Sequence, residues 1–284
     1  MEQSDRREER GGADAYIESN RGLWDERTRV HVSSDFYDVA SFKDGSRTNR
    51  LRPYEMEEVG DVRGKDLLHV QCHFGLDTLS WAQLGATVTG IDFSAESIGE
   101  ARRLAAEVGL DATFVQSDVY DLPNNLTGDF DIVYTSRGVL GWLPDIGEWA
   151  RVLARFVRPG GFLYVTEVHP VLQAFDDEVE LGELKLRYRY WSGDVIRMPV
   201  EGSYADPSAE FATTHEHGWN HSLGEIVTAV ATAGLHIEHL HEFPFLEWPS
   251  PLLEEQEDGT WRLPGELDEK LPLFFSLKAT KPEL

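Results

Sequence analysis

Polar residues that could bind an adenosine follow four apolar segments of this sequence. They lie at residues 71–75, 91–94, 116–119 and 134–138. A carboxylate at the end of a strand, such as Asp92, can accept hydrogen bonds from both hydroxyls of a ribose. Asp118 could accept from an adenine amino group beside the apolar Val119, or it could simply be a turn carboxylate. These residue types predict a site for an adenosine-containing ligand.

The glycine content of residues 71–75 separates the candidate ligands. A dinucleotide loop needs G-x-G-x-x-G, because backbone must approach a pyrophosphate at a helix N-terminus. This loop has only Gly75, and the bulky Gln71, His73 and Phe74 occupy the rest of the turn. An uncharged or zwitterionic group fits such a loop better than a pyrophosphate. S-adenosylmethionine is a cofactor with an adenosine and no phosphate.

Strand-length apolar runs alternate with helical patterns from residue 66 onward, which is typical of βα units around a mainly parallel sheet. We expect strands at 67–72, 86–91, 112–115, 131–134, 162–166, 235–243 and 273–279, and helices at 77–84, 94–108, 146–156 and 222–233. In an open sheet of this kind the ligand lies at the carboxyl ends of the strands. The four polar segments should therefore converge on one crevice.

The rest of the chain divides by pattern around this core. We expect a charged, disordered leader at 1–13, a helical lid at 14–60 with a helix over 14–32, a core at 61–168, an inserted cap at 169–220 and the remainder of the core at 221–284. Within the cap, residues 187–196 are typical of two strands joined at a Ser-Gly turn.

The amino-acid composition limits the classes of partner that the protein can bind. The 284 residues include 51 acidic and 26 basic ones, a formal net charge of -25, which disfavours nucleic acid and anionic membranes. Cys72 is the single cysteine, so no disulfide can form within the chain. The first ten residues are too charged for a signal peptide, and no apolar run approaches the ~18 residues of a membrane span. We expect a soluble cytoplasmic protein that acts on a small molecule and can form a homodimer.

Over roughly residues 20–280 the chain resembles the class I S-adenosylmethionine-dependent methyltransferases, in particular the small-molecule type with a Q-C-H-x-G loop. The resemblance is carried by residues 67–80, 90–94, 117–119, 130–134 and 158–161, in order and at domain spacing. It departs from the family's usual acidic residue and G-x-G-x-G, because His69, Gln71 and His73 stand there. The resemblance implies an α/β fold with a Rossmann-like seven-stranded mainly parallel sheet, helices on both faces, an N-terminal helical lid and a small β-rich cap. It also implies a cofactor site made of Gln71, Cys72, His73, Gly75, Asp77, Thr78, Asp92, Phe93, Ser94, Ser117, Asp118, Val119, Thr135, Ser136, Arg137 and Gly138.

Methyl transfer is an in-line displacement at a sulfonium, so a base is needed only when the acceptor must lose a proton. Histidines near the strand ends and groups of the lid are the candidates, namely His169, His221, Tyr37 and His31. The spacing of His215, His217 and His221 could also suit zinc, but hydrogen bonding or substrate contact is favoured and no metal is predicted. We interpret His236, His239 and His241 as surface or packing residues on alternate faces of a strand.

The acceptor is less well specified than the cofactor. Lys185, Arg187 and Arg189 could form a cationic rim for an anionic acceptor, but pairing with the many carboxylates is favoured. Trp142, Trp191, Phe211 and Trp219 would suit an apolar acceptor, or could simply be core. The leading hypothesis is methyl transfer to an O, N or C atom of a small molecule. The alternatives are a regulatory protein that binds S-adenosylmethionine or S-adenosylhomocysteine without turnover, a nucleotide-dependent oxidoreductase on the same fold and, disfavoured by charge, an RNA methyltransferase.

Overall fold

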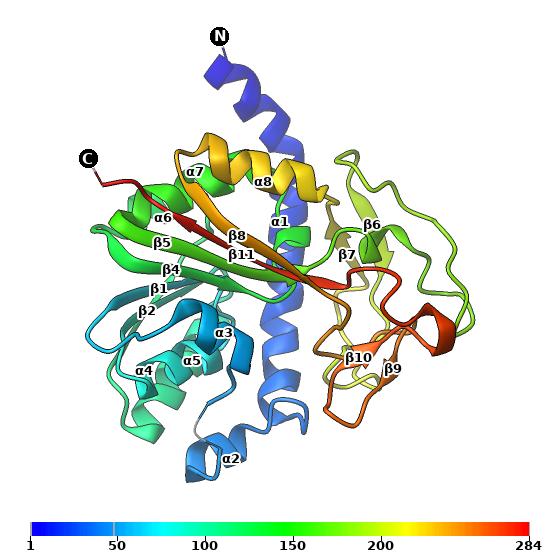
Figure 1. Cartoon of the computed structure of the whole chain (residues 1–284), viewed down its shortest axis with the longest axis horizontal. Helices are drawn as coiled ribbons and strands as arrows, with labels where there is room; N and C mark the ends of the chain where they lie inside the picture. Colours follow the sequence, from blue (N-terminus) through cyan, green and yellow to red (C-terminus); the bar gives the residue numbers. More distant parts are fainter. Residues whose placement is uncertain (1, 48, 284) are drawn as a thin grey trace.

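A seven-stranded sheet forms the centre of the computed structural model, which describes the backbone of residues 2–47 and 49–283 and the side chains from residue 13 onward within these ranges (Figure 1). The strands follow the order β3-β2-β1-β4-β5-β11-β8. All neighbours pair in parallel except β11, which is antiparallel to both β5 and β8. The bounds are β1 Asp66–Val70, β2 Thr87–Asp92, β3 Ala112–Gln116, β4 Phe130–Ser136, β5 Val157–Val168, β8 His236–Phe243 and β11 Phe274–Thr280. The predicted fold class is confirmed.

Helices cover both faces of this sheet (Figure 1). One face packs on α7 (Ile146–Phe156) and α8 (Leu223–Thr232), whose apolar stripes include Trp149 and Ile226. The other face packs on α3 (Pro53–Val59), α4 (Leu76–Gln83) and α5 (Ala95–Val108). Because β1 is covered on both sides, its Leu67, Leu68 and Val70 are all fully buried, as expected for a central parallel strand.

The helix boundaries follow the capping signals of the sequence. Ser94 accepts a hydrogen bond from the Ser97 backbone N–H at the start of α5, and Gly109 ends that helix in the left-handed conformation. Ser222 and Glu225 form the expected capping box of α8. The cap of α5 lies beside the end of β2, where Asp92 also bonds the loop that follows β1.

The long helix α1 (Glu2–Ser33) joins the core to the cap, since it contacts α5 on one side and β7 (His215–Gly218) on the other. The sequence predicts this helix only from residue 14. The structure continues it to Glu2, while the side chains of residues 1–12 lie outside the described residues. The short helices α2 (Val39–Asp44) and α6 (Leu122–Asn125) complete the helical elements around the core.

The cap differs from its expected form. Residues 187–195 form no strand; instead β6 (Ile196–Pro199) pairs with β7 in an antiparallel ladder. Leu186 and Trp191 are 69% and 66% exposed, so a hairpin at 187–196 would have had no apolar face to bury. The short turn η2 (Leu172–Ala174) leads into this region, and η1 (Leu140–Trp142), between β4 and α7, contacts β7.

A second excursion, between β8 and β11, adds to the cap although the sequence assigns it to the core. It holds the two-stranded ladder of β9 (Glu254–Glu255) and β10 (Trp261–Arg262) and the turn η3 (Gly265–Leu267). Leu252 and Leu263 pack there against Leu172 and Phe274. Residues from this excursion therefore reach the carboxyl edge of the sheet.

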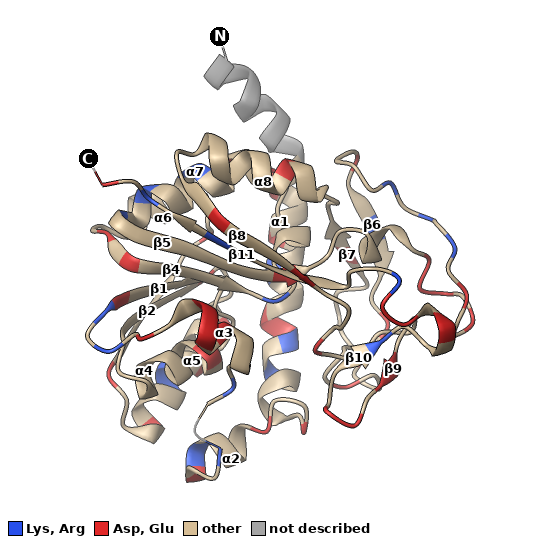
Figure 2. Cartoon of the chain, viewed as in Figure 1, with Lys and Arg blue, Asp and Glu red and all other residues tan. Residues whose placement is uncertain are grey.

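Acidic residues are spread over the core and the cap, with fewer basic residues among them (Figure 2). In the described part of the chain, no helix is long and apolar enough to cross a membrane.

Candidate active site

A cavity of about 580 Å³ lies at the carboxyl ends of the strands, under α1 and the cap. Thirteen of the sixteen residues predicted to bind the cofactor line it, namely Gln71, Cys72, His73, Gly75, Asp77, Asp92, Phe93, Ser117, Asp118, Val119, Ser136, Arg137 and Gly138. Thr78, Ser94 and Thr135 are fully buried behind this lining. The tertiary structure thus brings the four polar segments together around one space.

The loop after β1 has the backbone of a three-glycine turn although only one glycine is present. Gln71, His73 and Gly75 have φ angles of 60°, 51° and 81°, all in the left-handed region. Side chains other than glycine adopt this region at a cost, so the surroundings must hold it. The Gln71 side-chain amide donates to the Val139 carbonyl at 3.3 Å, and the His73 backbone N–H donates to Asp92 at 2.8 Å.

Close packing is a second reason for glycine at position 75. A Cβ at this position would lie 2.8 Å from the ring of Phe114 and 3.0 Å from Ala101. The close approach of the loop to β3 and α5 therefore requires glycine here, whereas Gln71 and His73 have room for their side chains.

Two histidine side chains, His73 in the cavity lining and His31 behind it, support the loop. His31 of α1 lies 2.9 Å from His73 Nε2 through its Nδ1 and 2.7 Å from Ser203 Oγ of the cap through its Nε2. His73 Nδ1 lies 3.0 Å from Ser97 Oγ. Burial lowers the pKa of His31 to about 3 and the pKa of His73 well below its usual value, so both imidazoles are neutral at neutral pH. The two histidines therefore connect the helical lid, the loop after β1 and the cap.

The strain at His73 leads to a prediction. Both His73→Ala and His73→Gly lose the contacts to His31 and Ser97, but only alanine keeps a Cβ in the left-handed region. The glycine variant should be more stable than the alanine variant by about 1 kcal/mol in urea unfolding. The control is Ala106→Gly on the exposed face of α5, where glycine should be less stable than alanine by a similar amount. An alanine variant as stable as the glycine variant would contradict the strained loop.

Asp92 ends β2 with both carboxylate oxygens facing loop backbone. One oxygen accepts from the His73 N–H at 2.8 Å and the other from the Ser94 N–H at 2.9 Å. Asp92 is 7% exposed, and burial raises its pKa to about 6 despite these hydrogen bonds. A carboxylate oxygen can accept more than one hydrogen bond, so the arrangement still allows ribose hydroxyls to bind.

The next strand end carries the residues expected at the adenine. Asp118 Oδ1 accepts from the Tyr120 N–H at 2.8 Å, the pattern of an Asx turn, and Ser117 donates to the Asp118 carbonyl at 2.8 Å. Asp118 therefore does act as a turn carboxylate. It lines the cavity together with Val119, so an adenine role stays a prediction.

Two polar groups of the cavity lining lack strong partners. Gln71 Oε1 is buried and has no hydrogen-bond partner among the described residues. Arg50 lines the cavity, donates to the Phe36 carbonyl at 3.2 Å and stacks over Tyr37 at 5.7 Å. Among the described residues, Arg50 has no carboxylate within ion-pair distance. An unused acceptor and an unpaired guanidinium fit the ammonium and carboxylate of a zwitterion.

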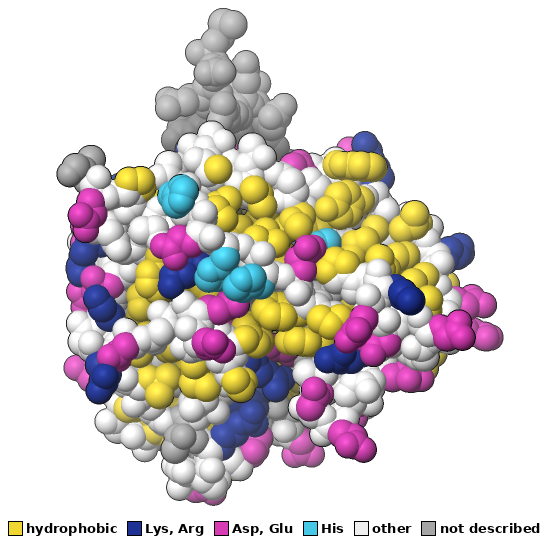
Figure 3. Space-filling view, viewed as in Figure 1, with side chains coloured by type: hydrophobic (Ala, Val, Ile, Leu, Met, Phe, Trp, Pro, Cys, Tyr) yellow, Lys and Arg dark blue, Asp and Glu magenta, His cyan; other side chains and the backbone are white. Residues whose placement is uncertain are grey.

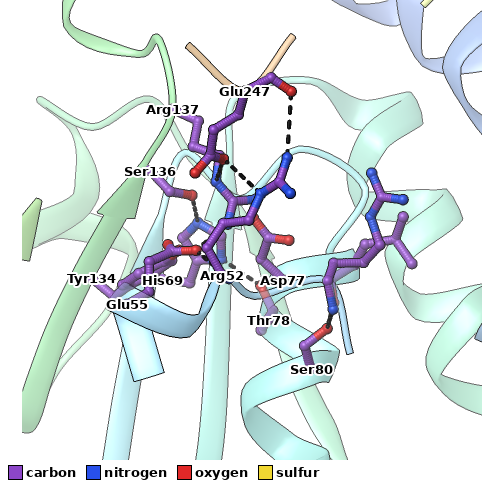
Figure 4. Close-up of polar contacts among 12 residues, drawn as sticks. Arg52, Glu55, His69, Asp77, Thr78, Ser80, Tyr134, Ser136, Arg137 and Glu247 are labelled. Atoms are coloured by element: carbon purple, nitrogen blue, oxygen red, sulfur yellow. Dashed lines mark hydrogen bonds and ion pairs between the residues drawn. The ribbon is translucent and has the colours of Figure 1, made fainter. Parts of the chain in front are cut away.

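Arg137 is the centre of a buried ion network, with a φ angle of 65° that aims its side chain across the strand ends (Figure 4). Its guanidinium is ion-paired to Glu55 of α3, to Asp77 of α4 at 3.0 Å and to Glu247 of the second cap excursion at 2.9 Å. Burial raises the pKa of Glu55, and the neighbouring guanidinium opposes this. Arg137 thus ties three separate elements to the end of β4.

The predicted catalytic residues lie in different places. Tyr37 lines the cavity, and its hydroxyl lies 2.6 Å from that of Tyr204 in the cap. His31 stands just behind the lining. His169 faces Glu242 at 3.0 Å and His221 bonds the Leu143 carbonyl at 2.7 Å, and neither lines the cavity. Burial raises the pKa of Tyr37 well above its usual value, so its hydroxyl is protonated at neutral pH.

The structure also places the residues behind the alternatives that the sequence left open. Lys185 and Arg187 pair with Asp176, as favoured over a cationic rim. Trp142 and Trp219 line the cavity, whereas Trp191 is exposed and Phe211 lies outside the lining. His215, His217 and His221 form no metal cluster within the described residues.

Sequence reasoning missed several residues of the site because no motif marks them. These are Arg50, Glu55, Tyr204 and Glu247, with Trp24 and Arg27 on α1. The Arg27 guanidinium lies 5.4 Å from the ring of Trp24 and 5.6 Å from the ring of Trp142, and it pairs with Glu216. The only sequence signal was the crowding of Arg47, Arg50 and Arg52 just before α3.

Comparison with known proteins agrees with this geometry. A model of the methyltransferase domain matches residues 68–163. The ubiquinone biosynthesis O-methyltransferases of Cronobacter sakazakii and Vibrio parahaemolyticus are 34% identical over 140 residues and 32% identical over 146 residues. These alignments cover 49% and 51% of this chain and 57% and 62% of the relatives, so the match spans less than two thirds of their length.

Solved structures extend the likeness over most of the chain. An S-adenosylmethionine-dependent methyltransferase from Mesorhizobium loti has a TM-score of 0.55 at 22% identity and covers 80% of this chain and 95% of its own. The protein DhpI, solved as its complex with SAH, has a TM-score of 0.54 at 19% identity and covers 94% and 97%. At these identities the likeness shows the fold. Residues 68–163 are therefore similar to a methyltransferase domain, and the chain has the fold of the class I S-adenosylmethionine-dependent methyltransferases.

Proposed function

We propose that this protein transfers a methyl group from S-adenosylmethionine to a small-molecule acceptor. The observation that carries the proposal is that Asp92, Gln71 and Val119 line the same cavity as the aromatic walls of α1 and the cap. One continuous space therefore holds an adenosine end and an apolar compartment. The O-methyltransferase relatives support the same class of reaction.

The residues present fit the cofactor group by group. Asp92 would accept from the ribose hydroxyls, and residues 117–119 would face the adenine. Gln71 Oε1 would accept from the ammonium of the methionine part, and Arg50 would pair with its carboxylate. When bound, the cofactor supplies an electrophilic methyl group on a sulfonium.

The chain's own contribution is alignment and exclusion of water. Trp24, Trp142 and Trp219 form an apolar wall where an acceptor would be desolvated. Tyr37 and Tyr204 present phenol hydroxyls that can orient a polar group of the acceptor. Such positioning can supply most of the acceleration of a displacement at sulfur-bound carbon. The aromatic wall fits a flat, apolar acceptor, and phenols are the first class to screen.

The pH dependence of binding tests the Asp92 assignment. Because burial raises the pKa of Asp92 to about 6, this carboxyl is protonated below that pH and loses one acceptor oxygen. The affinity for S-adenosylhomocysteine should rise about tenfold per pH unit up to about pH 6 and level off above it. Asp92→Asn should bind weakly with a flat profile between pH 5 and 8. A wild-type profile that is flat over this range would contradict the assignment.

Calorimetric titration with S-adenosylhomocysteine, S-adenosylmethionine and NAD, followed by an acceptor screen, tests the function itself. Binding of both sulfur ligands and methyl transfer to one acceptor class would support the proposal. Binding without transfer to a broad panel would favour a regulatory protein, and binding of NAD alone would favour an oxidoreductase. A homodimer and a cytoplasmic location stay predictions, the first to be checked by light scattering.

A further inference from the structure

Two histidines of the edge strand β8 lie side by side on the face covered by α3. His239 and His241 are two residues apart, so they share a face of the strand, and the interpretation that these histidines alternate is wrong for this pair. Their rings are stacked with centroids 4.3 Å apart and an interplanar angle of 8°. Figure 3 shows adjoining histidine side chains at the surface in the region where Figure 1 places β8.

Glu58 of α3 points its carboxylate at both rings. Its Oε1 lies 2.7 Å from His241 Nδ1, and its Oε2 lies 3.7 Å from His239 Nε2. Tyr164 donates to Oε2 at 2.7 Å, and Lys278 donates to the Glu58 backbone carbonyl at 2.9 Å. Tyr164 and His241 therefore hold the carboxylate of Glu58, and Lys278 holds its backbone.

The three side chains have the composition of a metal site. One ligand atom from each lies within 4.8 Å of the others. His239 Nε2 is buried and has no hydrogen-bond partner among the described residues. Two imidazoles and one carboxylate suit Zn²⁺, Co²⁺, Ni²⁺ or Cu²⁺, whereas Mg²⁺ and Ca²⁺ prefer oxygen ligands alone. The net charge of -25 also favours cations near the surface, although Lys278 locally opposes it.

We propose that Glu58, His239 and His241 bind a divalent transition metal ion. The metal would take the place of the proton between Glu58 Oε1 and His241 Nδ1 and would engage the unpartnered His239 Nε2, leaving further positions for water. It would also fasten α3 to β8. Glu55, one turn earlier on α3, pairs with Arg137, so the metal would stabilise a helix that contributes to the cavity network.

Titration of the untagged, chelator-treated protein with Zn²⁺ tests this site without measuring enzyme activity. We expect one Zn²⁺ per chain and a rise in Tm on binding. His241→Ala should weaken the affinity at least tenfold, since it removes a ligand. His236→Ala, an exposed histidine on the same strand, should leave the affinity unchanged. Absence of Zn²⁺ binding by the wild type, or equal loss in both variants, would overturn the proposal.

Cobalt substitution gives a second measurement that does not depend on a variant that folds. Co²⁺ bound to imidazole and carboxylate in a site of low coordination number should give visible absorption bands well above those of the aquo ion. Excess Mg²⁺ should not displace it, and Zn²⁺ should. A spectrum like that of aqueous Co²⁺, or displacement of the bound Co²⁺ by excess Mg²⁺, would sink the assignment.

Discussion

Asp92→Ala is expected to weaken binding of S-adenosylhomocysteine about a hundredfold while the protein stays folded. Two hydrogen bonds from ribose hydroxyls to a charged acceptor contribute roughly 3 kcal/mol together, which corresponds to about two orders of magnitude in Kd. Calorimetric titration of the wild type and the variant at pH 7.5 measures the change.

The fold should tolerate this substitution. The Ser94 and His73 N–H groups lose their acceptor, which destabilises the protein. The raised pKa of Asp92, however, means that its charge lowers the free energy of unfolding as pH rises from about 4 through about 6. Removing the charge offsets part of the loss at pH 7.5. Asp111→Ala, exposed at the start of β3, is the matched control and should bind normally. Unchanged affinity in Asp92→Ala would refute the ribose assignment.

Arg137→Ala is expected to lower the free energy of unfolding by about 3–5 kcal/mol at pH 7. The substitution leaves the buried Glu55 and the half-buried Asp77 without their guanidinium, while Glu247 keeps only one ion pair, with Arg52, and an unpaired buried charge is strongly destabilising. Arg137→Lys should recover only part of this, because an ammonium cannot span three carboxylates. Urea unfolding measures both variants.

The pH dependence distinguishes this network from simple loss of packing. In Arg137→Ala the clustered carboxyls can protonate as pH falls, so the destabilisation relative to the wild type should be smaller at pH 5 than at pH 7. Glu55→Gln in the Arg137→Ala background should raise the free energy of unfolding again, because it removes one of the clustered charges. The control, Arg151→Ala, removes a surface pair with Glu148 on α7 and should cost less than about 1 kcal/mol. A destabilisation of Arg137→Ala that is independent of pH would contradict the electrostatic account.

Local pattern was enough for the core of the fold. The predicted strands and helices from residue 66 to 168 match the observed elements to within a few residues at most boundaries, since burial on both faces gives parallel strands continuous apolar runs and Ser94 and Ser222 mark helix starts. The cap was harder. Residues 187–196 have strand-like residue types, but Leu186 and Trp191 find nothing to pack against, and strand pairing depends on such partners.

The sequence by itself determined which strand ends line the cavity, because the carboxyl ends of neighbouring parallel strands must meet at one edge and Asp92 and Gln71 stand at those ends. Tertiary structure alone decided the rest. Arg50, Tyr204 and Glu247 reach the cavity from the lid, the cap and the second excursion, and His169 points away from it. The reason is that strand order aligns residues by a repeating rule, whereas loops and insertions are placed by long-range packing and ion pairs that no local spacing records.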